Sequence, residues 1–201
     1  MSAARGVARA IDALRRGWPV VIDTALSLLA VETADDGRLA EFGGAGDVLL
    51  SSGRAETLKL ANQLDAATPG KPVLLAAAPW LDLPMARALA DPALDLVHPF
   101  KGPFQVLPCA HEEAGSSALE LARHAGLLPA FFVRRGTVEG AEPLSSAAIR
   151  AWDAPERLAA VTRARLPIAA CESAEIVAFR TPESASEHVA ILIGSPNGSP
   201  P

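Results

Sequence analysis

The most constraining feature of this sequence is the alternation of short aliphatic runs with amphipathic segments along most of its length. Val20–Ile22, Val48–Leu50 and Val73–Ala78 are β-branched or aliphatic runs of the kind that forms buried strands. Between them lie segments such as residues 4–16, in which apolar residues recur with helical spacing. Strands that alternate with helices predict a layered, mixed α/β domain.

The same pattern gives boundaries for each expected element. We expect a strand at 19–22 followed by an apolar run at 26–31, which makes either a hairpin with it or one bent strand. Segment 91–111 is rich in Pro, Gly and His and is predicted to be a long, folded loop. The other elements are helices at 4–16, 38–42, 55–64, 83–89, 116–124 and 155–163, and strands at 48–50, 73–78, 130–133, 174–180 and 188–193.

Changes of pattern near the C-terminus indicate a domain boundary at 164–168. After it, the last two strands form a β-hairpin around a polar turn at 181–187. Residues 195–201 are Ser, Pro, Asn and Gly, a composition typical of disorder or of a linker.

Composition excludes several classes of protein. The formal net charge is −5 and the pI about 5.4, which argues against a nucleic-acid binder. No apolar stretch approaches the roughly 20 residues that span a bilayer, and the N-terminus has no apolar signal core. We therefore expect a cytoplasmic protein with no membrane partner. In that compartment Cys109 and Cys171 are expected to be free, partly buried thiols rather than a disulfide.

Several local patterns have both a functional and a structural interpretation. Gly43–Gly46 is glycine-rich but lacks the Lys-Ser/Thr ending of a phosphate-binding loop, which favours a flexible turn. Ser51–Arg54 opens a helix and is explained by helix capping or by anion binding. His111–Glu113 has metal-ligating side chains in a loop where solvated polar residues are common, and His188 is either a strand histidine or a ligand. The three tryptophans are expected to anchor a core or an interface: Trp18, Trp80 and Trp152.

Two stretches together resemble dihydroxybutanone phosphate synthase. Ile11–Asp23 resembles that family's opening helix, which ends in an Arg-Arg-Gly turn before a Pro-Val-Val strand. Ser117–Ala130 resembles the helix, Gly-Leu turn and strand that follow the family's GHTEA motif. The resemblance implies the synthase fold over about residues 1–150.

The matched positions lack the chemistry that the synthase resemblance implies. That family is expected to hold a divalent metal with a glutamate and a histidine and to carry further acids nearby. The acidic loop that would follow Asp23 is replaced by a shorter apolar segment, and the histidine and glutamate of the motif fall on Ala114 and Ser116. A further acid falls on Arg135. A hard cation needs several oxygen ligands and proton abstraction needs a base, so no synthase activity is expected.

The C-terminal part resembles a second family. Residues 164–167, Ala174–Arg180 and Glu187–Gly194 resemble the first hairpin of GTP cyclohydrolase II. Members of that family are expected to hold zinc through three cysteines in a later segment, where the metal activates water for attack on the guanine ring. Cys109 and Cys171 cannot supply three zinc ligands.

The combination resembles bacterial GTP cyclohydrolase II with a degenerate synthase-like front domain. It implies a three-layer domain at 1–165 and the truncated start of the cyclohydrolase domain at 166–201. The chain is then the N-terminal part of an enzyme of riboflavin biosynthesis, itself structural, with no catalytic, cofactor-binding or metal-binding residues. Its expected partners are the missing catalytic domain and a second copy in a homodimer formed through the synthase-like domain.

Two alternatives remain open at this point. One is a stand-alone, non-catalytic protein that binds a sugar phosphate or regulates another protein. The other is an enzyme with a relocated site built from Asp23, His111, Glu112 and Glu113.

Overall fold

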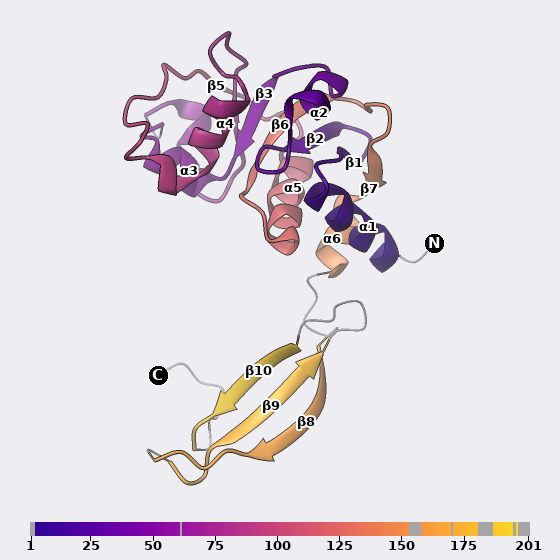
Figure 1. Ribbon diagram of the computed structural model, residues 1–201, viewed down its shortest axis with the longest axis vertical. Helices are drawn as coiled ribbons and strands as arrows, with labels where there is room; N and C mark the ends of the chain where they lie inside the picture. The colour runs from indigo at the N-terminus through magenta and orange to yellow at the C-terminus, as the bar shows by residue number, and fades with distance from the viewer. Residues whose placement is uncertain are drawn as a thin grey trace. The chain divides into compact units, whose positions relative to one another are not determined.

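The computed structural model describes residues 3–60, 62–152, 158–169, 171–180, 187–194 and 196. It divides the chain into two compact units, residues 1–151 and 152–201 (Figure 1). The division lies before the boundary predicted near 164–168, because the strand that ends at Arg165 belongs to the second unit.

A seven-stranded sheet forms the centre of the first unit, in the order β5-β4-β3-β6-β2-β1-β7 (Figure 1). Neighbouring strands are antiparallel, except that β1 and β7 are parallel. Both edge strands are short. Proline follows β5 and lies within β7, which limits pairing with other chains. The strands are β1 Val20–Ile22, β2 Leu26–Ala30, β3 Asp47–Leu50, β4 Val73–Leu75, β5 Val106–Leu107, β6 Ala130–Arg135 and β7 Glu142–Leu144.

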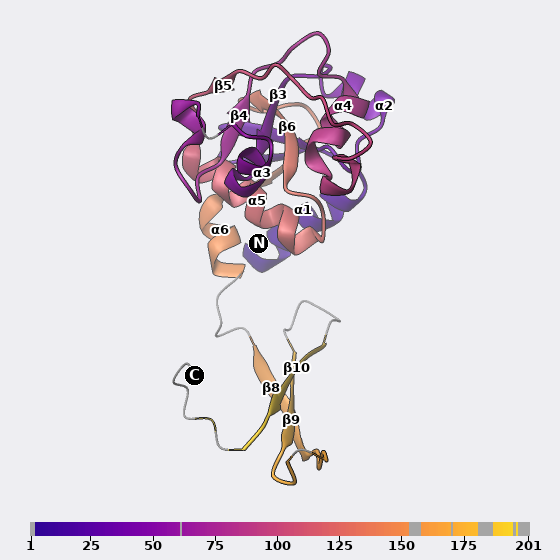
Figure 2. The ribbon, with the colours of Figure 1, turned by 90° about the vertical axis from the view of Figure 1, so that its left-hand side faces the viewer.

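Helices cover both faces of this sheet, so the first unit has three layers (Figure 2). Leu29 and Phe132 lie in a buried cluster with side chains of α2, α3 and α4. Because side chains alternate along a strand, Leu28 and Phe131 face the other side, where α1 and α5 pack near β1 and β2. The helices are α1 Ala3–Arg15, α2 Asp36–Glu41, α3 Ser52–Thr57, α4 Leu83–Ala90, α5 Glu112–Ala125 and α6 Ser146–Trp152, with 3-10 turns η1 Leu64–Ala66 and η2 Pro92–Leu94.

Local sequence signals explain where several helices start and stop. Asp35 accepts a hydrogen bond of 2.7 Å from the N–H of Arg38 and caps α2. Asp82 caps α4 in the same way. Gly126 ends α5 in the left-handed conformation, with φ of 70°, which glycine adopts without steric cost.

The predicted mixed α/β class is confirmed, and most elements of the first unit lie where they were expected. The apolar runs near the N-terminus form a hairpin of β1 and β2 rather than one bent strand. The helix predicted at 55–64 ends at Thr57, and Lys59 then takes a positive φ of 58° that a helix does not allow. The predicted loop at 91–111 contains η2 and the short strand β5.

The second unit is a three-stranded antiparallel sheet in the order β10-β9-β8 (Figure 1). Its strands are β8 Ala159–Arg165, β9 Glu175–Arg180 and β10 Glu187–Leu192, with a bulge in β8 between Ala160 and Thr162. The hairpin strands predicted at 174–180 and 188–193 are confirmed by β9 and β10. The predictions for 181–186 and for 197–201, together with Ser195, lie outside the described residues.

The helix predicted at 155–163 is wrong from Ala159 onward, because β8 occupies those positions. Antiparallel hydrogen bonding to β9 decides the structure of this segment. Residues 153–157 lie outside the described part of the chain. Helix α6 was not predicted.

Candidate functional site

Chemically active side chains of the first unit come together at a small hollow at the ends of β2, β3 and β6. The loop that follows β5 forms its other wall. The hollow has a volume of about 30 Å³, which is close to the share of one water molecule. Its lining residues are Leu26, Asp47, Leu49, Leu74, Pro108, Cys109, Ala110, His111, Val133 and Arg135.

Two of the polar groups around this hollow are already engaged or unreactive. The Asp47 carboxylate accepts a hydrogen bond of 2.9 Å from the N–H of Ala77, which ties β3 to the end of β4. Burial raises the pKa of the Cys109 thiol, so the thiolate that acts as a nucleophile or metal ligand is scarce at neutral pH. The hollow thus has no activated nucleophile among its described lining residues.

One of the three positions matched to the synthase motif, Arg135, lines this hollow. Ala114 and Ser116 are in the first turns of α5, where Ala114 is buried and Ser116 is exposed. Arg135 ends β6 and lines the hollow together with His111. The matched positions therefore carry an alanine, a serine and an arginine in place of the expected histidine and acids.

The acids proposed for a relocated site are held by separate partners. Asp23 accepts from the N–H and from the hydroxyl of Ser146, at 3.0 and 2.5 Å, at the start of α6. Glu112 pairs with Lys71 at 2.9 Å, and Glu113 pairs with Arg150. Because each carboxylate joins different elements of the fold, the structure does not assemble these acids with His111 into one site.

The described residues do not fit a metal. Within the ranges given above, no group of three or more His, Cys, Asp and Glu side chains is placed to hold an ion. Cys109 and Cys171 are free, partly buried thiols, as predicted, and they belong to different units. A zinc ion needs about four ligands, and the described residues do not supply them.

The Ser51–Arg54 segment is used for capping and for an internal ion pair. The Ser51 hydroxyl accepts from the N–H of Arg54 at 3.2 Å, which caps α3. The buried Arg54 guanidinium donates to both oxygens of Asp95, at 2.7 and 2.6 Å. These contacts support the capping interpretation over anion binding.

Arg54, Asp95 and Lys101 form a charged cluster that sequence reasoning missed. Lys101 donates to the same carboxylate, and Arg54 also donates to the carbonyl oxygen of Leu89. The pKa of Asp95 lies well below its usual range. The hydrogen bonding from Arg54 is the largest cause, and the hydrogen bond from Lys101 comes next. Arg54 and Asp95 are 41 residues apart in sequence, so no local spacing reveals the pair.

The glycine-rich turn and one of the predicted anchors, Trp80, also have structural roles. Arg134 donates to the carbonyl oxygens of Gly43 and Gly44. Gly43 has a φ of 97°, a backbone conformation that glycine adopts without steric cost, which explains the glycine without a phosphate. Trp80 packs on Phe104 with ring centroids 5.5 Å apart, whereas Trp18 is 43% exposed.

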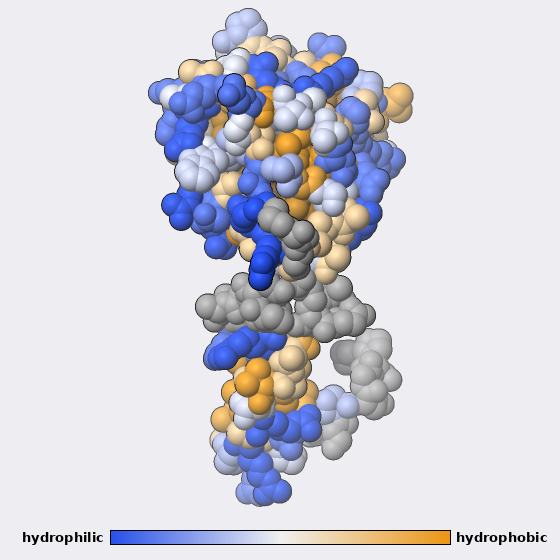
Figure 3. Space-filling model, turned by 90° about the vertical axis from the view of Figure 1, so that its right-hand side faces the viewer, coloured by the Kyte–Doolittle hydropathy of each residue, from blue (hydrophilic) through white to orange (hydrophobic). Residues whose placement is uncertain are grey.

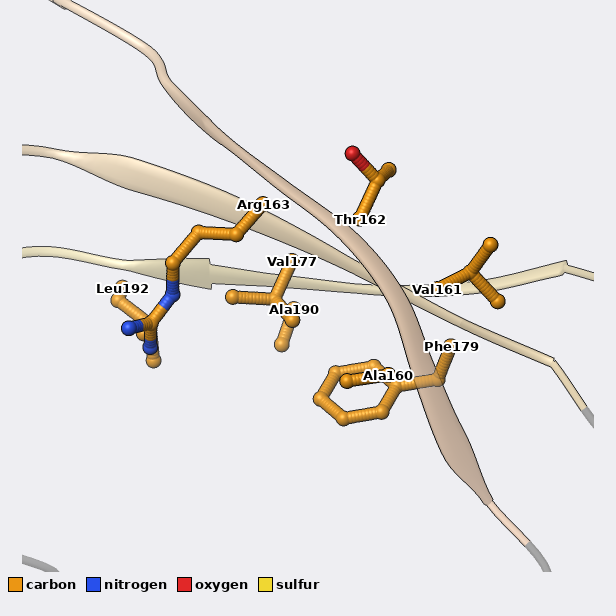
Figure 4. A pocket seen from close by; sticks show the side chains of 8 residues that line it. All are labelled: Ala160, Val161, Thr162, Arg163, Val177, Phe179, Ala190 and Leu192. Atoms are coloured by element: carbon orange, nitrogen blue, oxygen red, sulfur yellow. The ribbon is translucent and has the colours of Figure 1, made fainter.

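In the second unit, one face of the sheet is hollowed and apolar (Figure 4). The hollow of about 470 Å³ is open to solvent, and Phe179 and Val177 of β9 form its centre. His188 is exposed on β10, next to Phe179 in the register. The lining residues are Ala160, Val161, Thr162, Arg163, Val177, Phe179, Ala190 and Leu192.

The other face of this sheet also carries apolar side chains. Val189 and Ile191 point to it and are 55% and 56% exposed. Figure 3 shows apolar residues of this unit, coloured orange, at its surface. Within the described part of the chain, no helix or second sheet of the second unit covers either face.

The whole chain is similar to a known enzyme. It is 33% identical to GTP cyclohydrolase-2 of Azospirillum brasilense, over an alignment of 226 positions that covers 100% of this chain and 56% of the relative. The chain therefore spans little more than half the length of the curated relative that it matches. This similarity confirms the resemblance to GTP cyclohydrolase II.

Among solved structures, the crystal structure of a two-domain 3,4-dihydroxy-2-butanone 4-phosphate synthase from A. baumannii matches with 15% identity and a TM-score of 0.43. The match covers 96% of this chain and 71% of that chain. The sequence matches no protein-family model. No helix within the described residues is long and apolar enough to cross a membrane.

Proposed function

We propose that this chain is the front part of a cytoplasmic GTP cyclohydrolase II of riboflavin biosynthesis, and that it has no catalytic activity of its own. The similarity of the whole chain to GTP cyclohydrolase-2 carries this proposal. The aligned relative is much longer than the matched region, which leaves room for a catalytic segment that these residues do not contain. The first unit then corresponds to the degenerate synthase-like domain and the second unit begins the cyclohydrolase domain.

The chemistry of the first unit supports a structural role. Ala114, Ser116 and Arg135 stand where the synthase resemblance implies a histidine and acids. Asp23 directly precedes the segment that replaces the expected acidic loop. Both oxygens of its carboxylate accept hydrogen bonds from Ser146. A metal-assisted proton abstraction from a sugar phosphate needs free carboxylates and a base, and these positions supply neither.

The shape of the hollow argues against the alternative of a stand-alone sugar-phosphate sensor. Its volume of about 30 Å³ holds roughly one water molecule. A pentose phosphate is many times larger, so it cannot enter this hollow without a rearrangement of the loop that follows β5. We therefore prefer the structural role over a sensor at this place.

The second unit supports the idea that a larger domain follows. A three-stranded sheet with apolar residues on both faces needs a covering layer on each, because domains bury the apolar faces of their sheets. Val161 lines the hollow and is 58% exposed, and Val189 and Ile191 on the other face are 55% and 56% exposed, so these side chains need such layers. We propose that the remainder of the cyclohydrolase domain supplies them.

The gene itself gives the first test. Sequencing beyond codon 201 is expected to show an open frame that runs into a three-cysteine zinc motif. A stop codon directly after Pro201 would contradict the proposal.

A substitution tests the covering of the sheet in the longer gene product. Phe179→Asp places a charge at the centre of the apolar hollow, and burying it without a partner costs several kcal/mol. We expect GTP turnover and thermal stability of the longer product to fall sharply. The control is Leu96→Asp, at a first-unit side chain that is 94% exposed; it should change neither quantity. If Phe179→Asp behaves like Leu96→Asp, the hollow is not a covered face.

A further inference from the structure

A second hollow of the first unit lies on the surface, between the end of α1, helix α2 and the loop that joins β6 to β7. We call it the Trp18 hollow. Its volume is about 230 Å³. Ligand sites in proteins are concave and mostly apolar, with a few polar groups that fix the orientation of the ligand, and the lining of this hollow has both parts. The lining residues are Trp18, Pro19, Arg38, Glu41, Phe42, Val138, Glu139 and Gly140.

The apolar part of the lining is held in place by the fold. Phe42 is only 2% exposed and caps the C-terminus of α2. Trp18 is 43% exposed, and its backbone N–H donates to the carbonyl oxygen of Ala13 at 2.9 Å, which anchors it to α1. A wall that is already ordered loses little conformational entropy when a ligand binds.

The cation of the hollow, Arg38, is held against the indole instead of in an ion pair. Its guanidinium carbon lies 5.6 Å from the centroid of the Trp18 ring, in a cation–π contact. Glu41 follows three residues later on α2, a spacing at which opposite charges often pair. Within the described part of the chain, however, the Arg38 side chain forms no ion pair and no hydrogen bond. Its N–H donors are therefore available to a carboxylate from outside the chain, which a guanidinium binds through two parallel hydrogen bonds.

Two carboxylates line the same hollow without a counter-charge of their own. Glu41 comes from α2 and Glu139 from the loop between β6 and β7, and both are exposed. Neither forms an ion pair with any residue that the structure describes. An ammonium group carries several N–H donors and no acceptor, so one such group can donate to both carboxylates.

The three features together match one class of small molecule. A ligand with a carboxylate, an ammonium group and an apolar body satisfies the cation, the carboxylates and the apolar wall at once. A phosphate, in contrast, would bring its negative charge close to Glu41 and Glu139. A cavity of ~150 Å³ accommodates benzene, so a hollow of about 230 Å³ has room for an aromatic ring and the few backbone atoms of an amino acid.

We propose that the Trp18 hollow binds a free amino acid with an apolar side chain, and that an aromatic side chain fills it best. Arg38 holds the α-carboxylate, and Glu41 and Glu139 hold the α-ammonium group. The side chain of the ligand lies against Phe42 and the indole. The binding is reversible and forms no covalent bond. The proposal rests on the first unit alone and does not depend on the assignment to riboflavin biosynthesis.

Calorimetric titration of the full chain with L-phenylalanine tests this site. Two analogues separate the contributions of the charges: N-acetyl-L-phenylalanine lacks the ammonium group, and L-phenylalaninamide lacks the carboxylate. Arg38→Gln and Glu139→Gln remove the protein's own charges, one on a helix and the other in a loop. The control is Glu56→Gln, at an exposed position of α3 outside the hollow. Urea unfolding of each variant checks that it is folded.

We expect L-phenylalanine to bind one site per chain with a Kd of about 1 mM or less. Each analogue should bind the wild type at least about tenfold more weakly, and each of the two variants should bind L-phenylalanine more weakly by a similar factor, because each change removes a charge-assisted hydrogen bond. Glu56→Gln should bind like the wild type.

Three results would overturn the proposal. The first is the absence of saturable binding of L-phenylalanine below about 10 mM. The second is binding of both analogues as strongly as L-phenylalanine, because the chain would then recognise only the apolar body. The third is wild-type binding by both Arg38→Gln and Glu139→Gln, which would place the ligand elsewhere on the chain.

Discussion

Replacing Asp95 with asparagine should be one of the most destabilising substitutions of a single polar side chain in the first unit. The Asp95 carboxylate receives two hydrogen bonds from Arg54, at 2.7 and 2.6 Å, and a further one from Lys101. The side chains of Arg54 and Lys101 are only 6% and 5% exposed, whereas that of Asp95 is 31% exposed. A neutral amide at this position would leave two nearly buried cations without a counter-charge.

The expected loss follows from these exposures. Removing one partner of a fully buried ion pair costs about 3–5 kcal/mol, and the partial exposure of Asp95 lowers this range. We expect Asp95→Asn to reduce the free energy of unfolding by about 2–4 kcal/mol at neutral pH. Replacing all three side chains with apolar residues of similar size should cost much less, because no unpaired charge then remains buried.

Urea unfolding followed by tryptophan fluorescence measures the loss. Trp80 packs on Phe104, a few residues after Lys101, and therefore reports on this part of the first unit. The control is Glu120→Gln, which breaks an exposed pair with Arg123 and should cost less than about 0.5 kcal/mol. An Asp95→Asn variant that unfolds at the same urea concentration as Glu120→Gln would refute the reasoning.

The same cluster gives a dependence on pH. The folded pKa of Asp95 lies below its unfolded value because Arg54 and Lys101 donate to the carboxylate. Its contribution to stability is therefore complete above the unfolded pKa of about 3.9 and is lost as the pH falls through the lower folded pKa. The wild type should lose stability in acid more steeply than Asp95→Asn, and equal slopes would contradict the role of this carboxylate.

Three further predictions concern single positions. Gly17→Ala should destabilise the chain by about 2 kcal/mol or more, because Gly17 has a φ of 69° and the new Cβ would lie 2.4 Å from a backbone carbonyl oxygen. The control is Gly126→Ala, where φ is 70° but no atom lies near the new Cβ. It should cost only about 1 kcal/mol in the same urea titration. A thiol reagent at neutral pH should label Cys171 faster than Cys109, since hydrogen bonding with Ser173 lowers the pKa of Cys171 and burial raises that of Cys109; mass spectrometry of the labelled peptides would show the reverse order if this is wrong. Asp23→Ala should lower the free energy of unfolding by about 1–3 kcal/mol through the loss of its two hydrogen bonds to α6, and near-wild-type stability would contradict that role.

Much of the first unit could be predicted because its elements carry local signals. The aliphatic runs at Val20–Ile22 and Val48–Leu50 are buried strands, and the amphipathic start of the chain is a helix. The prediction failed where pairing decided the structure. Residues 159–163 were predicted to be helical, yet they form β8 because β9 offers a partner for hydrogen bonding.

The candidate site was predictable in part. The resemblance matched Ala114, Ser116 and Arg135 to the synthase motif; Arg135 lines the hollow, whereas Ala114 and Ser116 lie in α5 and are not among its lining residues. The roles of Asp23 and Arg54 were not predictable, since their partners Ser146 and Asp95 are distant in sequence. Long-range contacts of this kind leave no trace in spacing or composition.

Turnover of GTP decides whether this chain is the non-catalytic front part of a GTP cyclohydrolase II. The chain of residues 1–201 and the longer product of the same gene would be incubated with GTP under the same conditions, with and without a zinc chelator. We predict that the longer product consumes GTP and loses this activity with the chelator, whereas residues 1–201 consume none. Turnover of GTP by residues 1–201 alone would contradict the claim that this part is structural, and no turnover by a folded longer product would contradict the assignment to GTP cyclohydrolase II.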